Sequence, residues 1–147
     1  MIGTTVEIDG IERTITRLTA RVTLTDVAVT ELVDDELDHG ENVARRNIQE
    51  YVYARPQGAN TRYVRTMTLL NSVKSGRIRR GGATAAGQVY ISREKFKRVY
   101  YPPFVEWGDE VGAPYEGRHY WEKTVAELKA DFLIKGRIVG RKIAKGT

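Results

Sequence analysis

Apolar residues recur at spacings of three and four in the first third of the chain, and this pattern predicts one long helix with a single buried face. The stripe starts at Val29 and ends at Tyr51, with these positions between them: Val33, Leu37, Gly40, Ala44 and Ile48. Such spacing places side chains on one side of a helix with 3.6 residues per turn. A helix from Leu24 to Tyr51 is roughly 40 Å long. The rest of the chain therefore has to pack along a rod.

The flanks of this helix carry start and stop signals. Thr23 or Thr25 is available as its N-cap, and residues 55–60 contain the Pro and Gly that break a helix. A separate first helix is expected over Ile11–Leu18, preceded by a short strand over residues 4–8, where polar and apolar residues alternate up to an Asp-Gly turn. Gly40 lies on the apolar stripe, so it either permits a close approach or marks a kink.

The middle of the chain predicts a short helix or extended arm over residues 63–72, followed by a β-hairpin. Two strands, residues 73–80 and 87–92, flank the small, glycine-rich segment 81–86, which we expect to be a mobile tip. Strand alternation places Arg77 and Arg79 on one face and Ile78 on the other. The arginines thus gather at the root of the tip.

The last element reads as an amphipathic helix from about Glu116 or Gly117 to Ala144. Its stripe comprises Trp121, Val125, Leu128 and Phe132, and its acidic residues precede its basic ones, as the helix dipole favours. Gly136 and Gly140 each weaken a helix by about 1 kcal/mol relative to Ala. A loose basic tail is therefore expected from about residue 136.

Length and composition narrow the class of protein. The chain has 147 residues, enough for a single domain over 1–147 with a modest core. It has no Cys, which excludes disulfides and thiolate metal sites. No apolar run approaches the roughly 18 residues of a membrane span, and the first residues lack the pattern of a secretory signal. We therefore expect a soluble protein with no membrane partner.

Catalytic patterns find little support in the sequence. His39 and His119 stand in unrelated contexts, the serines lack nucleophile-elbow surroundings, and no recognisable acid–base pair of carboxylates occurs. Asp35 and His39 are four residues apart and could share an ion, but no further converging ligand is evident nearby. We expect no enzyme, no cofactor and no metal.

Charge is strongly segregated along the chain. The net charge is −6 over residues 1–54, +10 over residues 55–100 and +1 over residues 101–147. Acidic side chains gather on one helix face at Asp34, Asp35 and Asp38. Three interpretations remain: solvated faces, contact of the basic middle with nucleic acid, or contact of the basic middle with the acidic first segment of a neighbouring copy. Tyrosines near bases, such as Tyr100, could stack on nucleic acid or pack in the core or in an interface.

A single carboxylate stands in an aromatic and apolar stretch between residues 100 and 108. Glu106 lies between Val105 and Trp107, and Gly108 follows. Desolvating an unpaired carboxylate costs several kcal/mol, so a buried Glu has to be hydrogen-bonded or paired. We interpret Glu106 as a structural residue whose carboxylate bonds backbone amides.

The order of these parts resembles the small neck or tail-completion proteins of long-tailed bacteriophages. That family shows a Pro, a Thr-Gly-x-Leu-x-x-Ser segment and a Tyr-Ala-x-x-Val-Glu-x-Gly segment before a terminal helix. The corresponding residues here are Thr66, Leu69 or Leu70, and Ser72 for the first segment, and Tyr100 or Tyr101, Val105, Glu106 and Gly108 for the second. Met67 replaces the usual Gly, and Pro102-Pro103 replaces the Ala region, which predicts that the local helix before Glu106 starts late or is distorted.

The resemblance implies an α+β fold with long N- and C-terminal helices on a small, mostly antiparallel sheet. It also implies a structural virion protein that forms a ring in the neck between the DNA-filled head and the tail, made in the cytoplasm of the host bacterium. Implied partners are copies of the chain itself and neighbouring head-closure and tail-terminator rings, with transient contact with double-stranded DNA left open. The rival roles are a tail terminator and, in another class, a basic double-stranded-DNA-binding module.

From the residues, we place the candidate interface of such a ring on charged and glycine positions: Arg77, Arg79, Arg80, Gly81, Gly82, Asp34, Asp35 and Asp38. Heterologous contacts between neighbours need two unlike surfaces, and the acidic helix face and the basic hairpin supply them. The structural motif comprises Tyr101, Val105, Glu106, Trp107 and Gly108.

Overall fold

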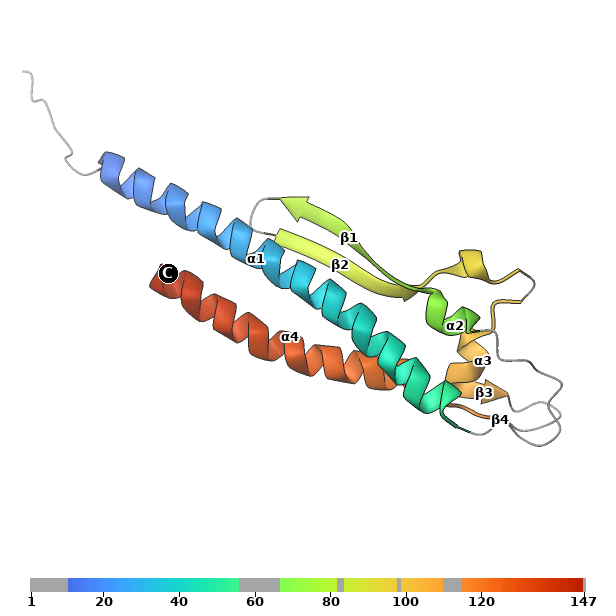
Figure 1. Cartoon of the computed structure of the whole chain (residues 1–147). Helices are drawn as coiled ribbons and strands as arrows, with labels where there is room; N and C mark the ends of the chain where they lie inside the picture. The colour runs from blue at the N-terminus through green and yellow to red at the C-terminus, as the bar shows by residue number, and fades with distance from the viewer. Residues whose placement is uncertain (1–10, 56–66, 82–83, 98, 110–114, 147) are drawn as a thin grey trace, which may run out of the picture.

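A single 38-residue helix, α1 (Ile11–Ile48), runs along most of the molecule (Figure 1). The computed structural model describes residues 11–55, 67–81, 84–97, 99–109 and 115–146. A π-helical turn, Gln49–Tyr53, continues α1. The helix therefore ends just before residues 55–60, where the sequence predicted its end. The predicted stripe is correct, but the two predicted helices are one. The strand expected over residues 4–8 lies outside the described residues.

The predicted N-caps, Thr23 and Thr25, are wrong because both residues lie inside α1. Their hydroxyls donate to carbonyls one turn back, Thr23 Oγ1 to Thr19 O (3.1 Å) and Thr25 Oγ1 to Arg21 O (2.8 Å). A Thr hydroxyl inside a helix commonly satisfies its hydrogen-bonding capacity with the carbonyl one turn back. Its presence in a sequence therefore does not separate a helix start from a helix interior.

An antiparallel hairpin follows the short helix α2 (Thr68–Asn71). Strand β1 (Val73–Gly81) pairs with β2 (Thr84–Ile91), from Val73 opposite Ile91 to Gly81 opposite Thr84. Residues 84–86, predicted as part of a mobile tip, belong to β2. The register shifts between Arg77 and Arg79, so a bulge at Ile78 interrupts the strict alternation that the sequence predicted.

The closing part contains a 3₁₀ turn, Arg93–Lys95, the helix α3 (Pro102–Trp107), two short antiparallel strands, β3 (Gly108–Asp109) and β4 (Tyr115–Glu116), and the helix α4 (Tyr120–Lys145). Helix α3 starts at Pro102, so the delay expected from the two prolines is wrong; Pro is well tolerated in a first helical turn.

Helix α4 begins three or four residues later than predicted, because Glu116 is held in β4. It also continues through Gly136 and Gly140, so the loose tail expected from residue 136 is helical to Lys145.

Both the hairpin and α4 pack along α1 (Figure 1). The buried core lies near the C-terminal end of α1, where α2, β1 and α4 converge, and consists of Ala44, Ile48, Leu69, Val73 and Tyr120. Gly40 permits the close approach that the sequence allowed: a Cβ there would lie 2.8 Å from Val89 Cγ2 and 3.3 Å from Leu128 Cδ1. The α+β fold class, with long terminal helices and small antiparallel sheets, is confirmed.

No helix in the described part of the chain combines the length and the hydropathy that a membrane span requires.

Candidate functional site

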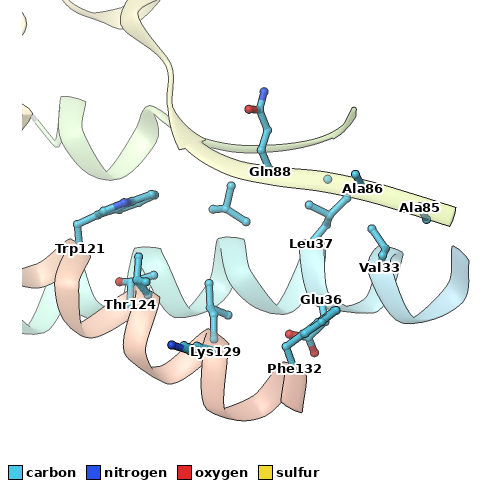
Figure 2. A pocket seen from close by; sticks show the side chains of 14 residues that line it. Val33, Glu36, Leu37, Ala85, Ala86, Gln88, Trp121, Thr124, Lys129 and Phe132 are labelled. Carbon is cyan, nitrogen blue, oxygen red and sulfur yellow. The ribbon is translucent and has the colours of Figure 1, made fainter. Parts of the chain in front are cut away.

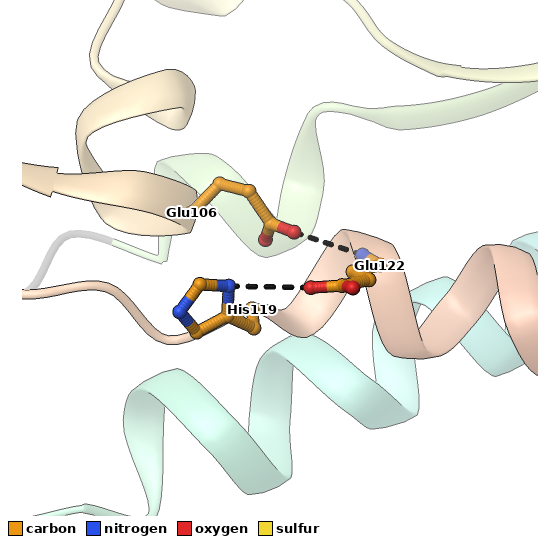
Figure 3. A group of neighbouring side chains, drawn as sticks. All are labelled: Glu106, His119 and Glu122. Atoms are coloured by element: carbon orange, nitrogen blue, oxygen red, sulfur yellow. Dashed lines mark hydrogen bonds and ion pairs between the residues drawn. The ribbon is translucent and has the colours of Figure 1, made fainter.

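Glu106 caps the N-terminus of α4 from outside that helix. Its two carboxylate oxygens accept the backbone N–H groups of Trp121 and Glu122, each at 2.8 Å. Figure 3 shows the bond from Glu122. The side chain is 4% exposed. The first N–H groups of a helix have no intrahelical acceptor, and an anion there also interacts favourably with the helix dipole. The predicted role of Glu106, a buried carboxylate bonded to backbone amides, is confirmed.

The residues around Glu106 fix its position. The carbonyls of Val105 and Glu106 accept the N–H groups of Arg118 (2.8 Å) and His119 (3.1 Å). Gly108 has a φ of 88°, which favours glycine, and it ends α3. A Cβ at Gly117 would lie 2.4 Å from Glu106 O, so only glycine fits there. The Val-Glu-x-Gly segment thus forms a joint in which hydrogen bonds hold α3 against the start of α4.

Tyr101 and Trp107, the two remaining motif residues, pack at the edges of this joint. The ring of Tyr101 meets Phe96 edge-on at 5.0 Å between centroids, and that of Trp107 meets His119 at 5.7 Å. Trp107 is 64% exposed. Tyr100 also packs on Phe96, and its ring lies under Arg93, at 5.6 Å. The tyrosines therefore pack against their own chain, one of the roles that the sequence left open for them.

Three side chains at this joint come close enough to hold a metal ion. Ligand atoms of Glu106, His119 and Glu122 lie within 4.8 Å of one another (Figure 3). Both oxygens of Glu106 already accept helix N–H groups, His119 Nδ1 lies 3.3 Å from Glu122 Oε2, and the helix N-terminus is the positive end of its dipole. The arrangement is that of a helix cap. Among the described residues, Asp35 and His39 form no such group; His39 lies 3.5 Å from Asp131 of α4.

Two of the predicted interface residues pair with each other inside one chain. Arg77 of β1 donates from Nε and Nη2 to the two carboxylate oxygens of Asp34 on α1. The acidic first segment and the basic middle therefore do meet, as the charge pattern suggested, but this pair lies within the chain and not between copies. It holds the hairpin against α1.

The other predicted interface residues are placed less completely. Asp35 and Asp38 are exposed on α1. Gly81 ends β1 opposite Thr84. The side chains of Arg79 and Arg80, and the whole of Gly82, lie outside the described residues. Their role in an interface stays a prediction.

Further polar contacts tie the covered part of α1 to its neighbours. Lys135 of α4 contacts Glu36 at 2.6 Å, and Asn47 donates to Thr124 Oγ1 at 3.0 Å. Glu41 accepts from Arg45 at 2.7 Å and from the Ser75 hydroxyl at 3.0 Å. The hydrogen bond from Arg45 lowers the pKa of Glu41. These contacts hold the covered part of α1 against β1 and α4, while Asp35 and Asp38 stay exposed.

An apolar groove of about 630 Å³ runs between β2 and α4, with α1 as its floor (Figure 2). The wall on α4 carries the predicted stripe, Trp121, Val125, Leu128 and Phe132. The wall on β2 is lined by residues 85–89, of which the first three are the small Ala85, Ala86 and Gly87. Val125 is 52% exposed and Phe132 45%. The stripe is therefore only partly covered by its own chain. The sequence did not indicate the β2 wall, because residues 84–86 were predicted as a loop, and it did not show that β2 and α4 stand apart.

Comparisons with protein-family models, with curated proteins and with solved structures found no match to this chain.

Proposed function

We propose that this protein is a structural component of the virion of a tailed bacteriophage, where identical copies form a ring in the neck that connects the head to the tail. The observation that carries this proposal is the amount of apolar surface that the chain leaves uncovered. A monomeric protein rarely exposes large contiguous apolar patches, and such patches mark interaction sites.

The numbers of buried and exposed hydrophobic side chains show how much apolar surface is left uncovered. Among the described residues, seven hydrophobic side chains are buried, whereas fourteen large hydrophobic side chains are exposed. Five of the exposed ones lie on α4: Val125, Phe132, Leu133, Ile134 and Ile138. Val125 and Phe132 line the groove, and the other three lie outside it on α4. An assembly in which neighbours cover these surfaces accounts for them, and a solitary monomer does not.

The neck motif also supports the proposal through its role in the fold. The Val-Glu-x-Gly segment, on which the resemblance depends, joins α3 to the capped start of the closing helix. A segment with this architectural task suits a structural protein. The predicted ring contacts at Arg79, Arg80, Gly81 and Gly82 belong to this proposal, as do Asp35 and Asp38 on the outer side of α1.

Light scattering of the purified protein over a wide concentration range tests self-assembly, and negative-stain electron microscopy tests the shape. We expect one discrete mass, a fixed multiple of the chain mass, and closed rings in projection. A monomer at every concentration contradicts self-assembly of the isolated chain. Discrete open or two-fold particles retain self-assembly and contradict the ring.

The basic hairpin can be tested in the same experiments. Replacing Arg79 and Arg80 together by Glu is expected to abolish rings, whereas the matched reversal of two exposed bases that follow the hairpin, Lys95 and Lys97, is expected to preserve them. Rings from both double variants would remove Arg79 and Arg80 from the interface. The tail-terminator role also predicts rings, and the two roles differ in whether the protein copurifies with heads or with tails.

Double-stranded DNA binding is the rival from another class, and the basic end of α4 is the surface that favours it. Arg137, Arg141, Lys142 and Lys145 are exposed there. This rival predicts an affinity that falls with a log–log salt slope of about 0.9 per neutralised phosphate. Steep salt-dependent binding by a protein that forms no ring would replace our proposal.

A further inference from the structure

Residues 16–23 of α1 are exposed, whereas residues 24–26 are half-buried. The contacts of Glu36 with Lys135 and of His39 with Asp131 show that α1 and α4 run antiparallel. Helix α4 ends ten residues after Lys135, at Lys145, so its end lies opposite about residue 26 of α1. We call residues 11–26 the arm. In Figure 1 the arm extends past the end of α4 and past the hairpin, over roughly 23 Å at 1.5 Å per residue.

The arm carries the same apolar seam that faces α4 in the rest of α1. Counting from Ile11, seam positions recur at alternating intervals of four and three: Ile11, Ile15, Leu18, Val22, Thr25, Val29, Leu32, Glu36, His39 and Val43. The later positions contact α4 through Glu36 and His39, and Val43 is 1% exposed. Leu18 and Val22, in the arm, are 57% and 59% exposed. Residues at the a and d positions of such a heptad pattern pack against a second helix.

The composition of the arm makes a covering partner necessary. Eight of its sixteen residues are Ile, Val or Thr, which have low helix propensity because their branched side chains lose rotamer freedom. The arm extends a helix that is already nucleated, so its turns depend on propagation, which these residue types support weakly. Packing of the seam is therefore what can hold the arm helical.

We propose that the partner is the arm of a second copy, aligned in parallel as a two-stranded coiled coil. This inference rests on the proposed self-assembly but not on a place in a virion. In heptad notation Ile15 and Val22 are a positions, and Leu18 is a d position. Branched residues at a with Leu at d favour parallel two-stranded pairing.

Charge selects the parallel alignment over the antiparallel one. In the parallel pair, Arg21 at a g position faces Asp26 at the e position of the other copy, five residues on, and the two charges attract. In an antiparallel pair that packs Leu18 against Val22 of the other copy, Arg21 would face Arg21 of the other copy. Like charges across a seam are unfavourable.

Cysteine cross-linking of the full chain tests the alignment. The natural chain has no Cys, so each variant carries one thiol. Val22→Cys places two thiols at facing a positions, within the Cβ separation of about 4 Å that a disulfide spans after small adjustment. The matched control is Ala20→Cys, because Ala20 is exposed in the same turns but lies on the outer side, at an f position. Under mild oxidation we expect at least roughly tenfold more covalent dimer for Val22→Cys.

The other outcomes separate this inference from the proposed function. Absence of the Val22→Cys dimer in a protein whose mass is still oligomeric overturns the arm pairing and leaves self-assembly through other surfaces. Cross-linking only when Leu18→Cys and Val22→Cys proteins are mixed overturns the parallel alignment. A monomeric wild-type protein that gives no cross-link overturns both proposals. Circular dichroism of each variant confirms that it folds.

A second pair of variants tests the seam without thiols. Leu18→Glu places a charge in the seam and is expected to lower the mass of the assembly, whereas Ala20→Glu on the outer side is expected to keep it. An equal mass for both variants, each folded, overturns the arm pairing.

Discussion

The two halves of α1 share one seam and differ in what covers it. From Leu32 to Ile48 the helix contacts α4 and the hairpin, and the seam residue Val43 is 1% exposed. In the arm, Leu18 and Val22 carry the same spacing and are more than half exposed. The difference teaches that periodicity fixes which face of a helix is buried but not which chain buries it. The predictions below test this comparison, from the largest expected effect to the smallest.

Truncation of one apolar residue in each half of α1 should give very different losses of stability. Ile48→Ala removes a fully buried side chain and leaves a cavity, which lowers the free energy of unfolding by about 2–5 kcal/mol. Leu18→Ala in dilute protein changes it by less than about 0.5 kcal/mol, because the side chain is already exposed. Urea denaturation at low concentration measures both. Equal losses would show that the arm is covered within its own chain.

Removal of the Glu106 cap should weaken α4, the helix that covers the C-terminal half of the seam. Glu106→Gln replaces one acceptor oxygen by an NH₂ group that faces a helix N–H, so the free energy of unfolding should fall by about 1–3 kcal/mol. Glu116→Gln, at an exposed position of β4, is the control. Thermal denaturation measures the difference. Wild-type stability in Glu106→Gln would contradict the cap.

The network of Glu41 on the covered half should give a defined pH dependence. Hydrogen bonding from Arg45 lowers the pKa of Glu41 in the folded protein, so its stabilising effect is complete above the unfolded pKa and is lost as the pH falls through the lower, folded value. We expect Glu41→Gln to be less stable than wild type by about 1 kcal/mol at pH 7 and the gap to narrow as the pH falls below the ordinary Glu pKa of about 4.3. A gap that stays constant down to pH 3 would remove the ionised carboxylate from this role.

The ion pair at the border between the two halves should contribute least. Arg77 is 50% exposed and Asp34 30%, and such partly solvated pairs are worth about 0.2–1 kcal/mol. A double-mutant cycle with Arg77→Gln and Asp34→Asn measures the coupling within dilute protein. If the coupling appears only when the protein is assembled, the pair acts between copies as the sequence first suggested.

The sequence predicted those features that depend on neighbours along the chain. Glu106 was identified because a carboxylate between Val105 and Trp107 needs backbone donors, and Gly40 because a residue without a side chain stands on an apolar stripe. The stripe of α1 and the hairpin were predicted for the same reason: periodicity is local information.

The features that the sequence did not predict depend on contacts between distant segments. Helix α4 starts at Tyr120 because β4 pairs with β3, and no residue near Glu116 signals that pairing. The first residues of β2, 84–86, are small and lie next to glycines, so their sequence predicts a loop. Only their pairing with β1 makes them a strand. Arg77 and Asp34 were both marked as charged interface residues, but charge alone does not say whether two segments meet within a chain or between copies.

Hydrogen exchange of the α1 amides at two protein concentrations tests the central claim most directly. We predict that amides of residues 40–48 are protected at both concentrations, because α4 and the hairpin cover them, and that amides of residues 16–25 are protected only at the high concentration, where copies associate. Protection of residues 16–25 that is already complete in dilute monomer would contradict the account, since it would mean that the arm needs no partner.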